Sequence, residues 1–218
     1  MSVKEHVTQE VKKIAAEGKA VDEKVVAFVK DDFHKTLADC EKTGHLVKQA
    51  TEETLEGVEA GLKAAGHKVG DAVSRSADAI ADVTRDVTAQ SLAAARTHAD
   101  NAKAALDKAV DKSSDTMEKV EAKTREGMEK AHAALHAKTE AEKARLQEVG
   151  EAIKEHAQSK THELNEATRK ALRNTAEKSK THLQALAQAS IEHSEKLLYH
   201  GNAKVAEWLG KLKDKVHH

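Results

Sequence analysis

Residues 21–40 read VDEKVVAFVKDDFHKTLADC. Apolar side chains recur at Val21, Val25, Val29, Phe33 and Leu37, and mostly polar or charged residues lie between them. Residues three and four apart share one face of an α-helix. The stretch therefore predicts an amphipathic helix that buries a narrow apolar stripe.

The same stripe continues along the chain in both directions. From Val3 to Ile80 it advances by about 3.67 residues per apolar step, which is an eleven-residue period and not a seven-residue one. The stripe weakens between about residues 88 and 145, where Ala, Thr and Ser predominate, and strengthens again from Leu146 to Val216. An eleven-residue period keeps the stripe nearly straight, so packed helices would coil slightly right-handed or hardly at all.

Composition favours helix throughout the chain. Its 218 residues include no proline and only 2% aromatic residues. Proline costs about 3 kcal/mol inside a helix, and the abundant Ala, Lys, Glu, Gln and Leu favour helix, whereas β-branched and aromatic residues are too few for a sheet. We predict an all-α protein of long amphipathic helices, folded as an extended hairpin or a helical bundle.

Only glycine marks breaks in the chain, and four glycines cluster in EGVEAGLKAAGHKVG, residues 56–70. The cluster comprises Gly57, Gly61, Gly66 and Gly70. It predicts a hinge or a close helix crossing, because small residues four apart let helices approach closely. A plain helix weakened by glycine and a membrane-inserting hairpin are the alternatives.

This cluster divides the chain into four predicted segments. They are an N-terminal amphipathic helical segment (1–56), the hinge or crossing segment (57–70), a long Ala-rich helical region (71–182) and a C-terminal amphipathic helical segment (183–218). Because the two ends of the stripe are the richer in Val, Leu and Ile, a hairpin or bundle that brings them together would fit.

Charge and cysteine content restrict the function. The 36 Lys and Arg nearly balance the 37 Asp and Glu, and no long basic run suggests a nucleic-acid partner. Cys40 is the single cysteine and falls on the stripe, so we predict a buried thiol and a reducing compartment. No segment has 18 uncharged apolar residues, and no signal region opens the chain. We expect a cytoplasmic protein without a transmembrane segment, or one peripheral to a membrane or granule.

Candidate chemistry is sparse. No Ser/His/Asp order, glycine-rich phosphate loop or C-x-x-C is present, so we predict no enzymatic activity and no cofactor. The best metal constellation lies in EKAHAALHAKTE, residues 129–140, and comprises Glu129, His132, His136 and Glu140. The Glu-x-x-His pair resembles half of a di-iron bundle motif, but the second half is absent. We therefore predict a solvated charge row, with a metal site as the weak candidate.

The chain ends with AKVAEWLGKLKDKVHH, residues 203–218, which contains its single tryptophan. On a helical projection the apolar residues form one arc with Trp208 at an edge, lysines flank both borders, and Glu207 and Asp214 lie opposite. This arrangement suits a helix lying in a lipid interface. Packing on the Val and Phe residues of the N-terminal segment, or on a protein partner, are the alternatives. The predicted surface-binding residues are Lys204, Val205, Trp208, Leu209, Lys211, Leu212, Lys213, Lys215 and Val216.

These features resemble three families of Ala-rich amphipathic helical proteins. Residues 203–216 are similar to the class A helices of exchangeable apolipoproteins. The eleven-residue period, and the texture of AAARTHADNAKAALDKAVDKSSDTMEKVEAKTRE (residues 93–126), resemble group 3 late-embryogenesis-abundant proteins. Phasins, which coat polyester storage granules, are similar in being helical and poor in proline.

The stripe, the tail and these resemblances lead to one functional expectation. We expect a non-enzymatic protein whose weakly packed bundle opens to associate reversibly with an apolar surface: lipid, a storage granule or a destabilised protein. The alternatives are a stress or desiccation protectant of the late-embryogenesis type and a structural, oligomeric helical scaffold. The expected partners are thus a second copy of the chain or an apolar or lipid surface.

Overall fold

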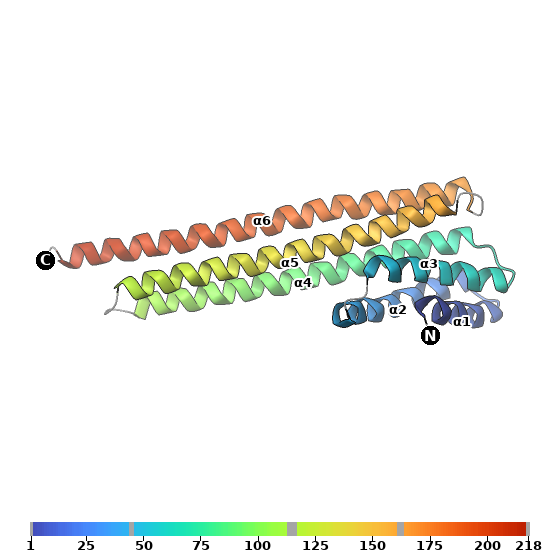
Figure 1. Cartoon of the computed structure of the whole chain (residues 1–218), viewed down its shortest axis with the longest axis horizontal. Helices are drawn as coiled ribbons and strands as arrows, with labels where there is room; N and C mark the ends of the chain where they lie inside the picture. The colour runs from blue at the N-terminus through green and yellow to red at the C-terminus, as the bar shows by residue number, and fades with distance from the viewer. Residues whose placement is uncertain (1, 44–45, 113–116, 161–163, 217–218) are drawn as a thin grey trace. The chain divides into compact units, whose positions relative to one another are not determined.

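The computed structural model describes residues 2–43, 46–112, 117–160 and 164–216, with side chains for all of these except 41–43, 117–118 and 211–216. Within these ranges the chain forms six α-helices and no strand (Figure 1). They are α1 (Val3–Ala16), α2 (Val21–Thr43), α3 (Val47–Ala64), α4 (Gly70–Lys112), α5 (Met117–Ser159) and α6 (Glu166–Val216). The prediction of an all-α helical bundle is confirmed.

The helices belong to two compact units. Unit 1 contains Met1–Thr88 and Lys143–Gln184, and unit 2 contains Ala89–Glu142 and Ala185–His218. Helices α1 to α3 lie wholly in unit 1, whereas α4, α5 and α6 each contribute a stretch to both units. The segment boundary predicted after residue 182 lies inside α6.

Side-chain caps and glycines set the helix ends. Ser2 and Glu5 form a capping box at the start of α1, in which the Ser2 hydroxyl accepts from the Glu5 N–H at 3.2 Å. Gly18 and Gly66, with φ of +72° and +74°, follow the ends of α1 and α3. Before α6, Asn165 Oδ1 accepts from the Thr168 N–H at 2.8 Å. The expectation that glycine alone marks the breaks is wrong at this point, because an asparagine cap starts the helix.

Burial repeats every eleven residues along the three long helices. The buried series are Ala77, Thr88, Ala99 and Val110 in α4; Thr124, Leu135, Leu146 and Ala157 in α5; and Thr168, Ser179, Ser190 and Gly201 in α6. Eleven residues make just over three full helical turns, so each helix keeps nearly the same side inward over its whole length.

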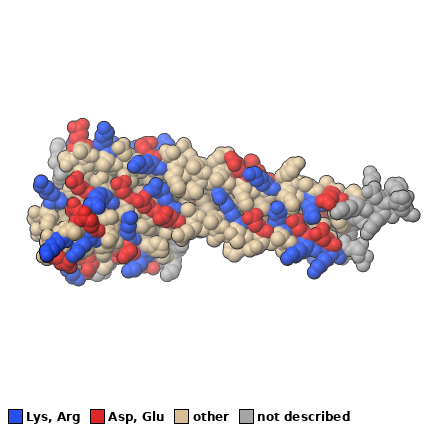
Figure 2. Space-filling model, turned by 180° about the vertical axis from the view of Figure 1, so that it is seen from behind, with Lys and Arg blue, Asp and Glu red and all other residues tan. Residues whose placement is uncertain are grey.

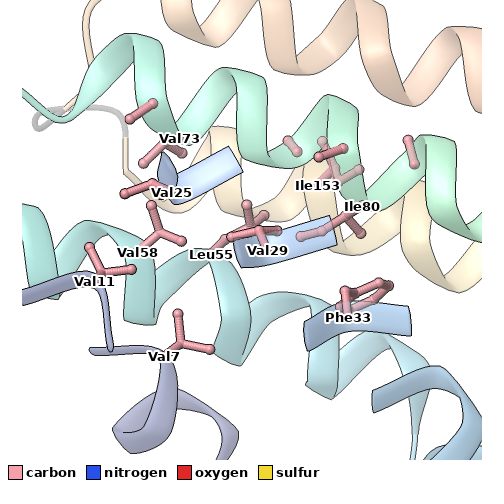
Figure 3. Packing of buried hydrophobic residues seen from close by; sticks show 14 of the residues in the cluster. Val7, Val11, Val25, Val29, Phe33, Leu55, Val58, Val73, Ile80 and Ile153 are labelled. Carbon is pink, nitrogen blue, oxygen red and sulfur yellow. The ribbon is translucent and has the colours of Figure 1, made fainter. Parts of the chain in front are cut away.

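The large apolar residues concentrate in the core of unit 1 (Figure 3). Val25, Val29 and Phe33 from the opening stretch are fully buried there. Their neighbours in the core come from α1, α3, α4 and α5, and those labelled in Figure 3 are Val7, Val11, Leu55, Val58, Val73, Ile80 and Ile153. Burying each such side chain contributes roughly 1.5–3 kcal/mol, so the aliphatic core stabilises unit 1.

The glycine cluster contains a close helix contact. A Cβ built on Gly57 would lie 2.7 Å from the Val7 Cβ, and one built on Gly61 would lie 2.7 Å from the Val11 Cβ. Helices α1 and α3 are therefore in close contact at these two positions, where α3 has room for the hydrogen of glycine but not for a methyl group. Gly66 serves a different purpose in the same cluster, because its positive φ turns the chain between α3 and α4.

The double substitution Gly57→Ala/Gly61→Ala tests this contact. We expect it to lower the free energy of unfolding by about 1–3 kcal/mol, because two added methyl groups overpack the valines. Urea unfolding followed by circular dichroism measures the change. Gly210→Ala is the matched control, since nothing lies within 4 Å of its Cβ position, and it should stabilise the helix by roughly 0.5–1 kcal/mol. Equal effects of the two variants would contradict the close contact.

Candidate functional site

Unit 2 contains the C-terminal segment and has a core of mixed quality. Its large buried apolar residues are Leu92, Val110, Met128, Leu135 and Leu197, and its small or hydroxyl-bearing ones are Ala99, Thr124, Thr139, Ser190 and Ser194. In its central apolar cluster Ala99 of α4 meets Leu135 of α5 and Leu197 of α6. Ala, Ser and Thr bury little apolar area, so the helices of unit 2 gain less from packing than those of unit 1.

Two buried hydroxyl groups of unit 2 bond within their own helices. Thr139 Oγ1 donates to the Leu135 carbonyl at 2.8 Å, and Ser194 Oγ donates to the Ile191 carbonyl at 2.8 Å. Ser190 differs, because its Oγ accepts from Arg96 Nη2 of α4 at 2.8 Å. Local bonds of the first kind persist when two helices separate.

Among the described residues, three close contacts join an aspartate of α4 to a histidine or lysine of α6 in unit 2. Their nitrogen–oxygen distances are 3.3 Å for His193–Asp100, 3.1 Å for His200–Asp107 and 3.5 Å for Lys204–Asp111. Every pair spans the same 93 residues of sequence, so α4 and α6 run parallel in a constant register. Partly exposed pairs of this kind add little free energy, but they specify which turns face one another.

Sequence reasoning missed these pairs although a signal was present. The acids of α4 and the cations of α6 repeat the same spacing of seven and then four residues. That match is informative only once the two helices are known to be parallel neighbours, which the separate stripes do not establish. On the face of the molecule in Figure 2, acidic and basic side chains are interspersed, and neither charge dominates it.

The predicted surface-binding residues lie in unit 2, and their described members are half-buried. Val205 and Leu209 line a groove, Trp208 is half-buried beside them, and Lys204 pairs with Asp111. The Val and Phe residues of the N-terminal segment instead pack in the core of unit 1. The side chains of Lys211, Leu212, Lys213, Lys215 and Val216 lie outside the described residues, although the backbone of α6 continues to Val216.

The α5/α6 groove is an opening of about 470 Å³ in unit 2. Its apolar walls are Met128 of α5 and Leu198, Val205 and Leu209 of α6, with Gly201 between them. The remaining lining residues are polar: Glu121, Arg125, Glu129 and Asn202. Gly201 lets α6 approach α5 closely, since a Cβ there would lie 2.6 Å from the Met128 Cγ.

The four residues of the weak metal candidate do not converge. Glu129, His136 and Glu140 are exposed and His132 is half-buried. The His132 and His136 rings lie 6.1 Å apart in a tilted arrangement. No group of three His, Cys, Asp or Glu residues within the described part of the chain is placed to hold a metal ion.

A buried carboxylate in unit 1 is a second polar feature that sequence reasoning missed. Glu59 of α3 is 3% exposed, and Lys63 Nζ lies 2.7 Å from its carboxylate. His156 Nε2 and Lys160 Nζ, at the end of α5, each lie 3.8 Å from the other oxygen. The cluster joins α3 to α5 with complementary charge. Removing a cation would leave a buried charge poorly compensated, which is strongly destabilising.

Burial also shifts two titrations in unit 1. It raises the pKa of the Cys40 thiol, which keeps that predicted buried cysteine, only 5% exposed, protonated and unreactive. Desolvation, reinforced by the Arg85 guanidinium, lowers the pKa of His182. The His182 Nε2 is buried and has no hydrogen-bond partner.

No protein-family model, curated protein or solved structure matches the chain. Among the helices in the described residues, none combines the length and apolar composition needed to cross a membrane.

His182 gives the stability of the protein a pH dependence that can be isolated. Folding lowers the pKa of His182. As the pH falls, the imidazole of the unfolded chain therefore takes up a proton at about pH 6.5, whereas that of the folded protein takes it up only at a lower pH. The associated stability is present above about pH 6.5 and is lost as the pH falls toward the lower pKa of the folded state. We expect the wild type to lose more stability than His182→Gln between about pH 7.5 and pH 5.5. Urea unfolding at both pH values measures this, and parallel losses would contradict it.

Proposed function

We propose that the protein is a non-enzymatic helical protein that associates reversibly with apolar surfaces such as lipid, a storage granule or a destabilised protein. In this proposal the helices of unit 2 separate and exchange contacts with one another for contacts with the surface. The observation that carries it is the mixed core of unit 2, in which five small or hydroxyl-bearing residues stand among five large apolar ones, and Thr139 and Ser194 bond to their own helices. Unit 1 keeps its aliphatic core during the exchange.

The free-energy cost of opening favours unit 2 over unit 1. Separating α5 from α6 leaves the hydroxyls of Thr139 and Ser194 bonded to carbonyls of their own helices, so no donor is stranded in an apolar contact. In unit 1, separating α3 from α5 would pull the Glu59 carboxylate from His156 and Lys160. The charge cluster and the aliphatic core therefore oppose opening there.

Opening would also supply the apolar area that the closed protein lacks. Among the described side chains, the large apolar ones that are exposed are Leu46, Ile191 and Tyr199. Separation of the unit 2 helices adds the inward faces of α5 and α6, beginning with the half-buried Val205, Trp208 and Leu209. Lysines at the borders of the same arc can cover apolar surface with their stems and keep their charges in water.

A reversible disulfide tests whether opening is required. A Cβ built on Gly201 lies 3.4 Å from the Met128 Cβ, close to the spacing of about 3.5–4.5 Å found in disulfides. We expect the variant Met128→Cys/Gly201→Cys, made with Cys40→Ala, to lose binding to phospholipid vesicles when oxidised and to recover it when reduced. Co-sedimentation with vesicles measures binding, and the two redox states of one protein control for the substitutions.

Tryptophan fluorescence gives a second, independent readout. We expect the Trp208 emission of the wild type to shift to the blue when vesicles are added, because the indole enters a less polar environment. Trp208→Ala should weaken vesicle binding while retaining the helical circular dichroism of the wild type. No co-sedimentation and no shift across anionic and zwitterionic vesicles would remove the proposal. Low helicity in dilute buffer that rises on drying would instead favour the protectant.

A further inference from the structure

The α5/α6 groove is unfilled although four of its lining residues are apolar. Met128, Leu198, Val205 and Leu209 form its walls around a volume of about 470 Å³. That volume admits side chains of another helix, and covering the walls would recover hydrophobic free energy that the groove leaves unused.

The rim of the groove is acidic. Glu121 and Glu129 line it, and Glu126 lies beside them on the adjoining surface of α5. Arg125 pairs with Glu121 and Lys130 pairs with Glu126, so three glutamates against these two cations give a net charge of −1, which Glu129 carries. An anionic headgroup would be repelled at this rim, whereas a basic amphipathic helix would be attracted.

The chain carries a helix of this kind in its own C-terminal segment. Residues 203–216 hold four lysines against Glu207 and Asp214, a net charge of +2. Their apolar residues lie on one arc of the helix. The segment also supplies Val205 and Leu209 to the wall of the groove. The same residues would therefore belong both to the groove and to a helix that docks in it. A surface that is both receptor and ligand is suited to a two-fold symmetric contact.

We propose that two copies of the protein pair through this surface, with residues 203–216 of each copy lying antiparallel in the α5/α6 groove of the other. When the two-fold axis passes between Val205 and Leu209, residue 213 of one copy is level with Gly201 of the other. The basic end of each segment then lies along the stretch of groove bordered by Glu129. The pairing does not require the proposed binding to apolar surfaces, but it would compete with that binding because it covers the same tail.

The mass of the full chain in solution, without vesicles, tests this pairing. We expect sedimentation equilibrium to show a dimer of the 23.6 kDa chain that dissociates on dilution and weakens at high salt. Glu129→Lys should raise the dimer dissociation constant by about tenfold, because it places a cation where the basic segment docks. Glu177→Lys, an equal change of charge on the exposed surface of α6 in unit 1, should leave the constant unchanged.

Val205→Asp tests the apolar part of the contact, and circular dichroism checks that this variant folds. We expect it to be monomeric, and Glu129→Lys provides the same test on an exposed position if Val205→Asp does not fold. A wild type that is monomeric at every concentration would overturn the pairing, even if it binds vesicles. A dimer unaffected by Glu129→Lys would place the contact elsewhere and overturn it too. Stronger binding of Glu129→Lys to anionic vesicles by a monomeric protein would assign the groove to lipid.

Discussion

The eleven-residue recurrence of buried positions is the constraint on which the long helices depend. A helix of 3.6 residues per turn returns to nearly the same angle after eleven residues, so an inward side chain is followed by another almost directly along the axis. In α5 the series Thr124, Leu135, Leu146 and Ala157 is buried at each step. Because the inward face hardly drifts, α4, α5 and α6 can serve two packed units without a change in the period of their sequence.

Both units bury residues at the same eleven-residue spacing, but they differ in the residue types of their cores. Unit 1 fills the inward positions with Val, Leu, Ile and Phe, and adds the closely packed α1 and α3 and the buried Glu59 cluster. Unit 2 has fewer large apolar residues in its core, where Leu92, Val110, Met128, Leu135 and Leu197 are mixed with as many Ala, Ser and Thr residues. The same helix can therefore be held firmly at one end and weakly at the other. This difference supports the proposed opening of unit 2, because a uniformly strong core would resist it.

Specificity of pairing comes from groups that contribute little stability. A hydroxyl that bonds within its own helix has no preference for a particular turn of the neighbouring helix. Two helices that meet through alanine faces can likewise shift along one another at little cost. In unit 2 the register between α4 and α6 is set instead by Asp100, Asp107 and Asp111 against cations 93 residues away, and by Arg96 against Ser190. The three pairs with aspartate are partly exposed, so water can replace them and they maintain the register without making separation costly.

The sequence by itself determined the helical class, the eleven-residue period, the weak stretch between about residues 88 and 145 and the amphipathic face of the tail, because each depends on spacing within one helix. Only the tertiary structure decided that the tail lies with α4 and α5 in unit 2, that Val205 and Leu209 face Met128 across a groove, and that Glu59 meets His156. It also decided where α5 gives way to α6, since nothing in the sequence distinguishes Asn165 from Asn101, Asn174 or Asn202 as the residue that starts a helix. These features depend on which distant turns become neighbours. A stripe of similar Ala and Leu positions does not specify which turns of two helices become neighbours. The complementary side-chain pairs and the glycines at close helix contacts select one arrangement only after the helices have come together.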